Sequence, residues 1–491
     1  PNPSTPPDPT TTPPPPPQPT PATTTRTNEL PPPNHSTTGR DRRSNPPPPS
    51  RTMTAPPPES SRRARSQRPP TREIRVLRVN PFDALRPPPD KAKAVASVPY
   101  DVVDRDEAAK LAENNPDSFL HVVRPDIDLP STTDPYADAV YETAKENLDK
   151  LVSTGTLTRD GKPCLYLYRQ VMTLDTPAGP KQLAQTGVVG CCHIDDYNNN
   201  LIKKHEKTRQ AKEDDRTRHV LTLNANTGPV FLLHEDEPTL DKLITAASTA
   251  DPIYDFTADD GVQHTVWRIE EYNPFVAAYA KLNAAYVADG HHRSASAARA
   301  GAERRAANPN HTGDEEYNWF LAVLFPASQL NILPYNRHVK DLNGLSPDQL
   351  INKLSAIARV EKDPDPEPRQ TGCFGMYLDN TWYAVTLPEG SIDHNHPINS
   401  LDYVLLDDRI LNPILGIGDI RTDERIDFVG GIRGTAELKN RVDQQGGVAF
   451  AMHPVTIEQL TRIADAGEIM PPKSTWFEPK LRSGLLVHTL D

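Results

Sequence analysis

Residues 1–72 consist largely of proline, serine and threonine, with uninterrupted proline runs at 13–17 and 46–49. Proline has no backbone N–H and a fixed φ, so such runs join neither a helix nor a sheet ladder. Few apolar side chains are present there to offset the entropy cost of ordering the chain. The sequence therefore predicts a disordered, partly polyproline II tail over residues 1–72, followed by a folded body.

Charge divides the chain at the same place. The whole sequence has a formal net charge of −12, although residues 1–70 carry nine arginines against four acidic residues. The body is therefore more acidic than the whole chain, which argues against nucleic acid as a partner, because phosphate backbones need Lys and Arg. The arginine cluster at 62–68 is interpreted as a solvated linker, a weak polyanion contact or part of an organellar presequence.

The cysteines and the apolar runs indicate the compartment. No run approaches the roughly 18 apolar residues of a membrane span, so we expect no membrane partner. Cys164, Cys191, Cys192 and Cys373 form neither a CxxC pair nor a disulfide framework. A reducing, cytoplasmic location is expected, with an organellar presequence left open. The adjacent pair Cys191 and Cys192 lies in an apolar run and is predicted to be buried strand, not metal ligand.

The hydrophobic pattern of the body is that of an α+β protein. Residues 136–151 place Val140, Ala144 and Leu148 on one face at helical spacing, which predicts a helix. Further helices are expected at 106–114, 239–247, 274–282 and 346–358, and strands at 74–79, 164–172, 185–194, 229–233, 265–269, 284–288, 318–325, 374–377 and 382–386. We predict one α+β domain over 73–335 and a second over 336–491, with a soft boundary.

Residues 289–293 read Asp-Gly-His-His-Arg, between an apolar run at 284–288 and an alanine-rich stretch at 294–302. This pattern places the five residues where a strand turns into a helix. The first N–H groups of a helix have no intrahelical partner and carry partial positive charge, so a phosphate can bind there. Gly290 lets the chain approach a ligand, and Asp289 can accept a proton or hold a cation.

The two histidines of this turn favour anion chemistry over metal chemistry. Adjacent residues such as His291 and His292 rarely point at one metal ion, and no HExxH or cysteine partner accompanies them. We therefore predict Asp289, His291 and His292 as catalytic residues, and Gly290 with Arg293 as phosphate-binding residues.

A second candidate is the charged segment at 203–209. Its simplest interpretation is a solvated helix held by neighbouring opposite charges. The alternative is an active-site lid in which Glu206 acts as a base toward a hydroxyl, kept ionised by its neighbours His205 and Lys207. The segment then also supplies the predicted phosphate-binding residues Lys203, Lys204, His205, Lys207, Thr208 and Arg209.

Four further polar stretches complete the candidates. Asn224, Thr227 and Gly228 belong to a loop that is either a plain turn or binds the amino or carboxylate group of a substrate. Asn336 and Arg337 are predicted substrate contacts as well, and residues 470–480 are interpreted as a scaffold loop. The acidic run at 314–316 is an exposed loop or a Mg²⁺ site, so no metal ligand is assigned.

Five stretches, at 98–103, 203–208, 288–293, 333–337 and 471–475, resemble the SerC-associated family of domain of unknown function ten-fifteen. The likeness runs from about residue 73 to the C-terminus. The turn at 289–293 is also similar to the phosphate-binding signature of the ParB/sulfiredoxin superfamily, which includes free L-serine kinases. The resemblance implies a ParB/sulfiredoxin-like, nucleotide-binding catalytic domain over 73–335, with an additional α+β portion at the C-terminus.

The same resemblance implies a function. In those kinases a glutamate deprotonates the serine hydroxyl, while the Asp-Gly-His-His-Arg turn holds the nucleotide phosphates. Asp289, His291, His292 and Arg293 match that turn, whereas Glu206 as the base rests on chemistry and not on alignment. The expected function is a small-molecule kinase that transfers a phosphoryl group from ATP, with Mg²⁺, to free L-serine and gives O-phosphoserine.

Two departures and two alternatives accompany this expectation. Sulfiredoxin needs a cysteine by its turn, and residues 285–299 contain none. ParB proteins add a DNA-binding surface, which the acidic body does not predict. The alternatives are a ParB-like nucleotide-binding switch without small-molecule turnover, and a non-catalytic protein whose proline-rich tail recruits SH3- or WW-like modules. The acceptor, the phosphate donor and the oligomeric state stay open.

Overall fold

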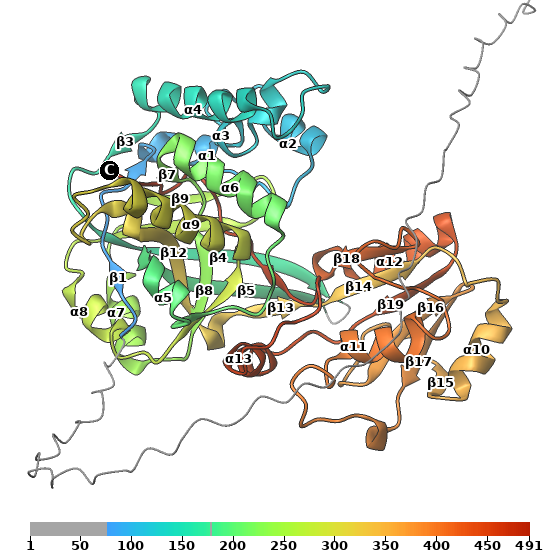
Figure 1. Cartoon of the computed structure of the whole chain (residues 1–491). Helices are drawn as coiled ribbons and strands as arrows, with labels where there is room; N and C mark the ends of the chain where they lie inside the picture. The colour runs from blue at the N-terminus through green and yellow to red at the C-terminus, as the bar shows by residue number, and fades with distance from the viewer. Residues whose placement is uncertain (1–75, 177–178) are drawn as a thin grey trace, which may run out of the picture. The chain divides into compact units, whose positions relative to one another are not determined.

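A computed structural model describes residues 76–176 and 179–491, and Figure 1 shows how its elements follow one another. The predicted tail at 1–72 and the arginine cluster at 62–68 lie outside the described residues. None of the described helices combines the length and the apolar character needed to cross a membrane. All four cysteines are free thiols, and Cys191 and Cys192 lie buried in a strand, as predicted.

The elements before residue 335 mix helices and strands. The helices are α1 (Ala92–Val95), α2 (Arg105–Leu111), α3 (Leu120–Val123), α4 (Asp138–Ser153), α5 (Ile194–Asn198), α6 (Gln210–Leu223), α7 (Pro238–Ala247), α8 (Asn273–Tyr279) and α9 (His291–Ala307). The strands are β1 (Val79–Asn80), β2 (Leu85–Arg86), β3 (Thr158–Arg159), β4 (Leu165–Thr176), β5 (Gly179–His193), β6 (Ile202–Lys203), β7 (Ala225–Asn226), β8 (Val230–His234), β9 (Tyr254–Thr257), β10 (Gln263–Ile269), β11 (Ala285–Asp289), β12 (Trp319–Pro326) and β13 (Asn331–Leu333).

The remaining elements repeat this mixture. The strands are β14 (Tyr335–Val339), β15 (Arg359–Lys362), β16 (Cys373–Leu378), β17 (Thr381–Thr386), β18 (Ile426–Gly430), β19 (Val448–Ala451), β20 (Trp476–Glu478) and β21 (His488–Thr489). The helices are α10 (Pro347–Ser355), α11 (Asp402–Leu406), α12 (Gly434–Gln445) and α13 (Ile457–Asp465). The α+β class predicted from the sequence is confirmed.

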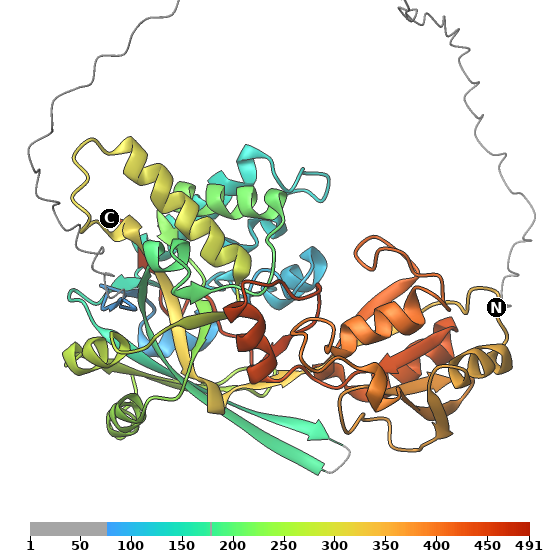
Figure 2. The same cartoon turned by 60° about the horizontal axis from the view of Figure 1, so that its bottom comes forward.

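The first sheet joins nine of these strands in the order β6-β11-β8-β12-β5-β4-β10-β9, with β1 added beside β5. Its central strands are buried on both faces, because successive side chains of a strand point to opposite sides. In β8, Val230 and Leu232 pack with α7, α8 and α9, while Phe231 and Leu233 join the core on the other face. The hairpin of β4 and β5 projects from this sheet in Figure 2.

Most predicted elements appear close to their expected places, and two differ for visible reasons. Helix α4 buries Val140, Ala144 and Leu148 as predicted. The strand expected at 74–79 is limited within the described residues to Val79 and Asn80, because the Arg78 N–H turns to the Asp196 carboxylate at 2.8 Å. The charged stretch from residue 201 is not one helix: it forms β6, then a loop, and only then α6.

The second sheet has six strands in the order β15-β17-β16-β19-β14-β18. After it, the chain returns to the first part of the body. Strand β20 pairs with β13, and β21 pairs with β7. The Phe477 ring packs on Phe231 of the first sheet, with ring centroids 5.5 Å apart. The first sheet takes its strands from residues 79–326 and the second from residues 335–451, while the last residues of the chain pair with strands of the first part.

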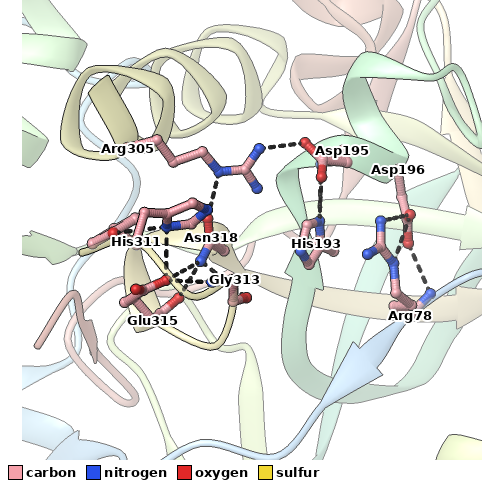
Figure 3. Close-up of polar contacts among 10 residues, drawn as sticks. Arg78, His193, Asp195, Asp196, Arg305, His311, Gly313, Glu315 and Asn318 are labelled. Carbon is pink, nitrogen blue, oxygen red and sulfur yellow. Dashed lines mark hydrogen bonds and ion pairs between the residues drawn. The ribbon is translucent and has the colours of Figure 1, made fainter. Parts of the chain in front are cut away.

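Helix α9 is fixed at its C-terminal end. Arg305 donates to Asp195 at 2.7 Å and to Asn318 at 2.5 Å, as Figure 3 shows. Gly301 in the same helix lies against the segment that precedes β12. A Cβ atom at this position would lie 2.4 Å from the Tyr317 carbonyl oxygen and 2.6 Å from Ile194 Cδ1. The packing of α9 therefore requires a residue without a side chain here.

We expect Gly301→Ala to destabilise the fold by about 1–3 kcal/mol, although alanine normally favours a helix interior over glycine by about 1 kcal/mol. The new methyl group would have to displace backbone, which is not a flexible neighbour. Chemical unfolding monitored by circular dichroism measures the change. Gly390→Ala is the control, because a Cβ atom there meets nothing within 4 Å. Equal midpoints for the Gly301 variant and the unmodified protein would contradict this packing.

Candidate active site

The Asp-Gly-His-His-Arg sequence forms the predicted turn from a strand into a helix. Strand β11 ends at Asp289, Gly290 adopts the left-handed conformation with φ of 93°, and α9 begins at His291. The first intrahelical hydrogen bond runs from the Ser294 N–H to the Gly290 carbonyl at 2.9 Å. Within the described residues no side chain caps this helix. Its first N–H groups are therefore free to meet an anion.

The Arg293 side chain folds back over Gly290. A Cβ atom at position 290 would lie 3.0 Å from Arg293 Nε, so the turn needs glycine for this close approach as well as for its φ. The guanidinium donates to the Pro229 carbonyl at 2.5 Å and to Asp289 Oδ2 at 3.1 Å. Its Nε is buried and has no hydrogen-bond partner among the described residues. The buried Nε–H donor of the guanidinium thus remains unused.

Asp289 lies between two cations. Besides Arg293, the Lys480 ammonium lies 3.7 Å from its Oδ2. Burial alone would raise the pKa of this carboxyl, but the charges of Lys480 and Arg293 prevail and hold the pKa below its usual range. Asp289 is therefore an ionised and partly exposed carboxylate.

The charged loop after β6 lies directly beside this turn. Strand β6 pairs in parallel with β11, so their carboxyl ends meet at the same edge of the sheet. Glu206 Oε2 lies 3.7 Å from His291 Nδ1, and the ring centroids of His205 and His291 are 4.5 Å apart at 87°. The Arg209 N–H donates to His292 Nε2 at 3.1 Å. Two segments that the sequence marks separately are thus brought together.

Glu206 has the properties of a base that a substrate can reach. Its side chain is 42% exposed. Burial of the remainder, and then the negative charge of Asp289, raise the pKa of Glu206, while Lys473 and Arg209 oppose the rise. The pKa of Glu206 is raised while that of Asp289 is lowered, and such divergence within a carboxylate pair is typical of acid–base sites.

The three histidines of the site are held neutral. Burial lowers the pKa of His205 to about 4 and that of His291 far below its usual value, and it also lowers the pKa of His292. His205 therefore supplies no positive charge to Glu206, contrary to our expectation. The cations that do lower the pKa of Glu206 are Lys473 and Arg209.

The other predicted phosphate-binding residues have partners within the protein or face solvent. The Lys203 ammonium lies 2.6 Å from Asp465 Oδ1, and Lys204 donates to the Tyr197 carbonyl at 3.0 Å. Thr208 donates to Glu213 at 2.8 Å, and Lys207 is exposed. Of these residues, His205 meets the turn through its ring and Arg209 through its backbone N–H.

A cavity of about 40 Å³ lies beside Arg293, with room for roughly three water-sized groups. It is too small for a nucleoside. Thr227 and Gly228 line it, together with Arg216 and Tyr100. Two of the predicted substrate contacts are thus found next to the turn.

The other predicted substrate contacts lie elsewhere. Asn224 ends α6 in the left-handed conformation, with φ of 53°, and accepts from Arg304. Asn336 and Arg337 are buried in β14 of the second sheet. Asn336 accepts from the Met452 N–H at 3.0 Å, and Arg337 donates to the carbonyls of Tyr335 at 2.7 Å and Lys473 at 3.1 Å. Their polar groups are paired within the protein.

The family model described as Protein of unknown function (DUF1015) matches residues 79–404, about two thirds of the chain. The chain belongs to this family. No curated protein matches the sequence.

Solved structures that resemble this DUF1015 member do so distantly. A free serine kinase in complex with AMP is 12% identical, with 61% of this chain and 91% of that chain covered and a TM-score of 0.31. SbnI with a C-terminal truncation, from Staphylococcus aureus, is 12% identical over 61% and 87%, with a TM-score of 0.34. A conserved hypothetical protein from Pyrococcus furiosus is 13% identical over 61% and 94%, with a TM-score of 0.30.

The acidic run at 314–316 of this DUF1015 member lies beyond the other end of α9. The residues that follow the run fold back onto this helix, where Tyr317 packs against Gly301 and Asn318 accepts from Arg305, about three to four turns from the start of α9. Glu315 binds its own loop, accepting from the Thr312 N–H at 2.6 Å and the Gly313 N–H at 3.0 Å, while His311 lies 2.8 Å away (Figure 3). Burial would raise the pKa of Glu315, but the hydrogen bonds from Thr312 and Gly313 lower it to about 2.

No metal centre is formed by protein side chains alone in the part of the chain that the structure describes. There, no group of three or more His, Cys, Asp or Glu side chains could hold a metal ion.

Sequence reasoning left out several charged residues at the site. Lys473 and Lys480 belong to the stretch interpreted only as a scaffold loop, beyond residue 404 where the family match ends. Asp101 lies next to Tyr100, and its charge acts on Glu206 and Arg293. The sequence signals were the family resemblance of residues 98–103 and 471–475 and the polar-aromatic composition of 470–480, and neither shows which charged side chain faces the turn.

Proposed function

We propose that this DUF1015 member is a small-molecule kinase that transfers a phosphoryl group from ATP, or a related nucleotide, to free L-serine and gives O-phosphoserine. One observation carries the proposal: the partly exposed carboxylate of Glu206 lies beside an uncapped helix N-terminus that follows the ionised Asp289. Phosphoryl transfer needs mainly positioning and charge neutralisation, and a base that receives the hydroxyl proton. Serine as the acceptor rests on the family resemblance.

The turn would hold the phosphates. The free N–H groups at the start of α9 and the unused Nε of Arg293 are donors for phosphate oxygens. Mg²⁺ accepts one or two carboxylates together with substrate phosphates, and the ionised, partly exposed Asp289 fits that need. The ion would neutralise charge on the transferred group.

The acceptor would lie between Glu206 and the cavity beside Arg293. Its hydroxyl oxygen forms the new bond to the terminal phosphorus of the nucleotide, the bond from that phosphorus to the bridging oxygen breaks, and Glu206 takes the hydroxyl proton. Thr227 and Gly228 line a space that suits the small polar groups of an amino acid and excludes a nucleoside. Binding at this cavity therefore favours a small acceptor.

The test is an assay of the full chain with L-serine, Mg²⁺ and either ATP or ADP, with O-phosphoserine measured by mass spectrometry. Formation of phosphoserine that depends on the nucleotide supports the proposal. Absence of phosphoserine with both donors contradicts it. Tight nucleotide binding without transfer to serine or any other small alcohol would instead favour the nucleotide-binding switch.

We expect Arg293→Ala to weaken nucleotide binding about 10- to 100-fold, since one charge-assisted hydrogen bond contributes roughly 1.5–3 kcal/mol. The guanidinium is the cation nearest to the start of α9, and alanine also removes its support of Asp289. Calorimetric titration with ADP measures the change. Arg299→Ala is the control, because Arg299 lies on the exposed part of the same helix and pairs with Asp214 and Glu303. An unchanged ADP affinity in Arg293→Ala would mean that Arg293 does not bind the nucleotide.

A further inference from the structure

The segment 470–480 runs from the end of the second part of the body back to the turn. Near its start, the Met470 N–H donates to the His205 carbonyl at 2.8 Å, next to Glu206. At its end, the Lys480 ammonium lies 3.7 Å from Asp289 Oδ2. The segment is therefore attached beside both carboxylates of the site, and Lys473 lies between the two attachments.

Lys473 is held in an unfavourable backbone conformation. Its φ is 60°, in the left-handed region that costs a residue with a Cβ atom about 1–2 kcal/mol. Its ammonium donates to the Tyr335 hydroxyl at 3.2 Å and lies 5.3 Å from the centre of that ring. Strain of this kind persists only where the surroundings fix the residue, and it often accompanies function.

Arg337 fixes Lys473. Arg337 is 2% exposed, and among the described residues it forms no ion pair with a carboxylate. It donates instead to the carbonyls of Tyr335 and Lys473, between the rings of Tyr403 and Phe428, whose centroids lie 4.9 Å and 4.5 Å away. A buried cation without a counter-ion is costly, so its two carbonyl partners are strongly held in place.

Binding a polyphosphate at this site would require more positive charge than the turn itself supplies. With its histidines neutral, the turn carries the carboxylate of Asp289 and the guanidinium of Arg293. Beside it, Glu206 and Asp101 add negative charge and Arg209 adds positive charge, so the protein charges near the turn roughly cancel before a ligand binds. Lys203 and Lys204 are directed to Asp465 and Tyr197. A polyphosphate brings several more negative charges. The returning segment supplies two cations: the Lys480 ammonium lies 3.7 Å from Asp289 Oδ2, and the Lys473 ammonium, held at the Tyr335 hydroxyl, is near enough for its charge to lower the pKa of Glu206.

We propose that Lys473 and Lys480 are ligand-binding residues for the phosphate groups held at the turn, and that Arg337 is a positioning residue that acts through the Lys473 backbone. This inference rests on the proposed function, because it assumes that the ligand is a polyphosphate. It extends the site to a part of the chain that the family model does not cover. In this proposal the buried Arg337 does not contact the ligand and acts only by holding the Lys473 backbone.

The first experiment compares Lys473→Met with Lys439→Met. Lys439 donates to a tyrosine hydroxyl as Lys473 does, at 2.8 Å to Tyr377, but it lies on α12 and pairs with Asp443. Both substitutions remove one charge and one lysine–tyrosine contact. Calorimetric titration of the full chain with ADP and with pyrophosphate is expected to show at least about tenfold weaker binding for Lys473→Met, and less than about twofold for Lys439→Met. Equal affinities in both variants would overturn the proposal.

The second experiment tests whether Arg337 acts through Lys473. Arg337→Met is measured alone and combined with Lys473→Met, in a double-mutant cycle of pyrophosphate affinity. In a positioning role, the Arg337 change weakens binding only while Lys473 is present. Additive losses would overturn that role. Where Arg337→Met does not fold, Tyr335→Phe replaces it in the same cycle, since it removes only the hydroxyl that accepts from Lys473.

The two proposals fail in different ways. If the unmodified protein binds ADP and Lys473→Met binds it equally well, the extension of the site is wrong and the kinase proposal stands. If Lys473→Met binds ADP more weakly while no small alcohol is phosphorylated, the assignment of Lys473 and Lys480 as phosphate-binding residues stands and the kinase proposal is wrong. A protein that binds neither ADP nor pyrophosphate overturns both.

Discussion

Glu206→Gln is expected to lower the turnover of serine by at least about 100-fold while ADP affinity changes less than about threefold. Glutamine keeps the shape of the side chain but accepts no proton, and general base catalysis contributes roughly 10²–10⁴-fold. Glu206 faces His291 at 3.7 Å, and within the described residues the position forms no hydrogen bond that the amide would break. Steady-state kinetics and ADP calorimetry on the same preparation measure the two quantities.

The pH dependence tests the same residue independently. Because burial and the charge of Asp289 raise the pKa of Glu206 above 4.5, kcat is expected to increase with pH through an apparent pKa above that value. The base works only when deprotonated, so activity is lost on the acid side. Lys473→Met should move this limb to still higher pH, because the lysine charge lowers the pKa of Glu206. If the acid limb of the kcat profile is unchanged in Lys473→Met, the charge of Lys473 does not act on Glu206.

The control is Glu303→Gln, which removes a carboxylate from the exposed side of α9, where it pairs with Arg299. We expect its turnover to stay within about twofold of the unmodified protein. Full activity in Glu206→Gln would mean that another carboxylate is the general base. Glu478 would then be the next candidate, because burial raises its pKa while Lys480 opposes the rise.

The local part of the site was predictable from the sequence. A continuous apolar run, a glycine and an alanine-rich stretch mark the change from a strand to a helix, and the structure has β11, Gly290 and α9 at those positions. Glu206 was proposed on chemical grounds alone, and its contact with His291 shows that the two segments meet. Local sequence pattern suffices where neighbours in the chain decide the conformation.

The charges of the site were not predictable in the same way. Strand β6 has two residues, and only its parallel pairing with β11 brings Glu206 to the turn. Lys203 pairs with Asp465, and Asp289 pairs with Lys480, although each pair is far apart in the sequence. The neutral state of His205 comes from burial, which no local pattern shows. Tertiary contacts therefore decide which of the many charged residues act at the turn.

Asp289→Asn is expected to lower serine turnover by at least about 100-fold and to bind metal-free ADP more tightly than the unmodified protein does. Asparagine is neutral and so cannot offer Mg²⁺ a charged ligand, which removes the ion's neutralisation of the transferred group. The loss of the carboxylate also leaves Arg293 and Lys480 without their shared partner. Both cations then meet the phosphates directly, and repulsion between carboxylate and phosphate disappears.

Affinity for ADP measured with and without Mg²⁺ separates these effects. In the unmodified protein Mg²⁺ should strengthen ADP binding, and in Asp289→Asn it should have little influence. Asp195→Asn is the matched control, because Asp195 pairs with Arg305 of α9 as Asp289 pairs with Arg293, but at the far end of the helix. It is expected to lose about 0.5–1 kcal/mol of stability and to keep its turnover and its Mg²⁺ response, since a partly exposed ion pair contributes little. An unchanged Mg²⁺ response in Asp289→Asn would mean that the ion is held by phosphate and water alone, and that Asp289 serves only to orient Arg293.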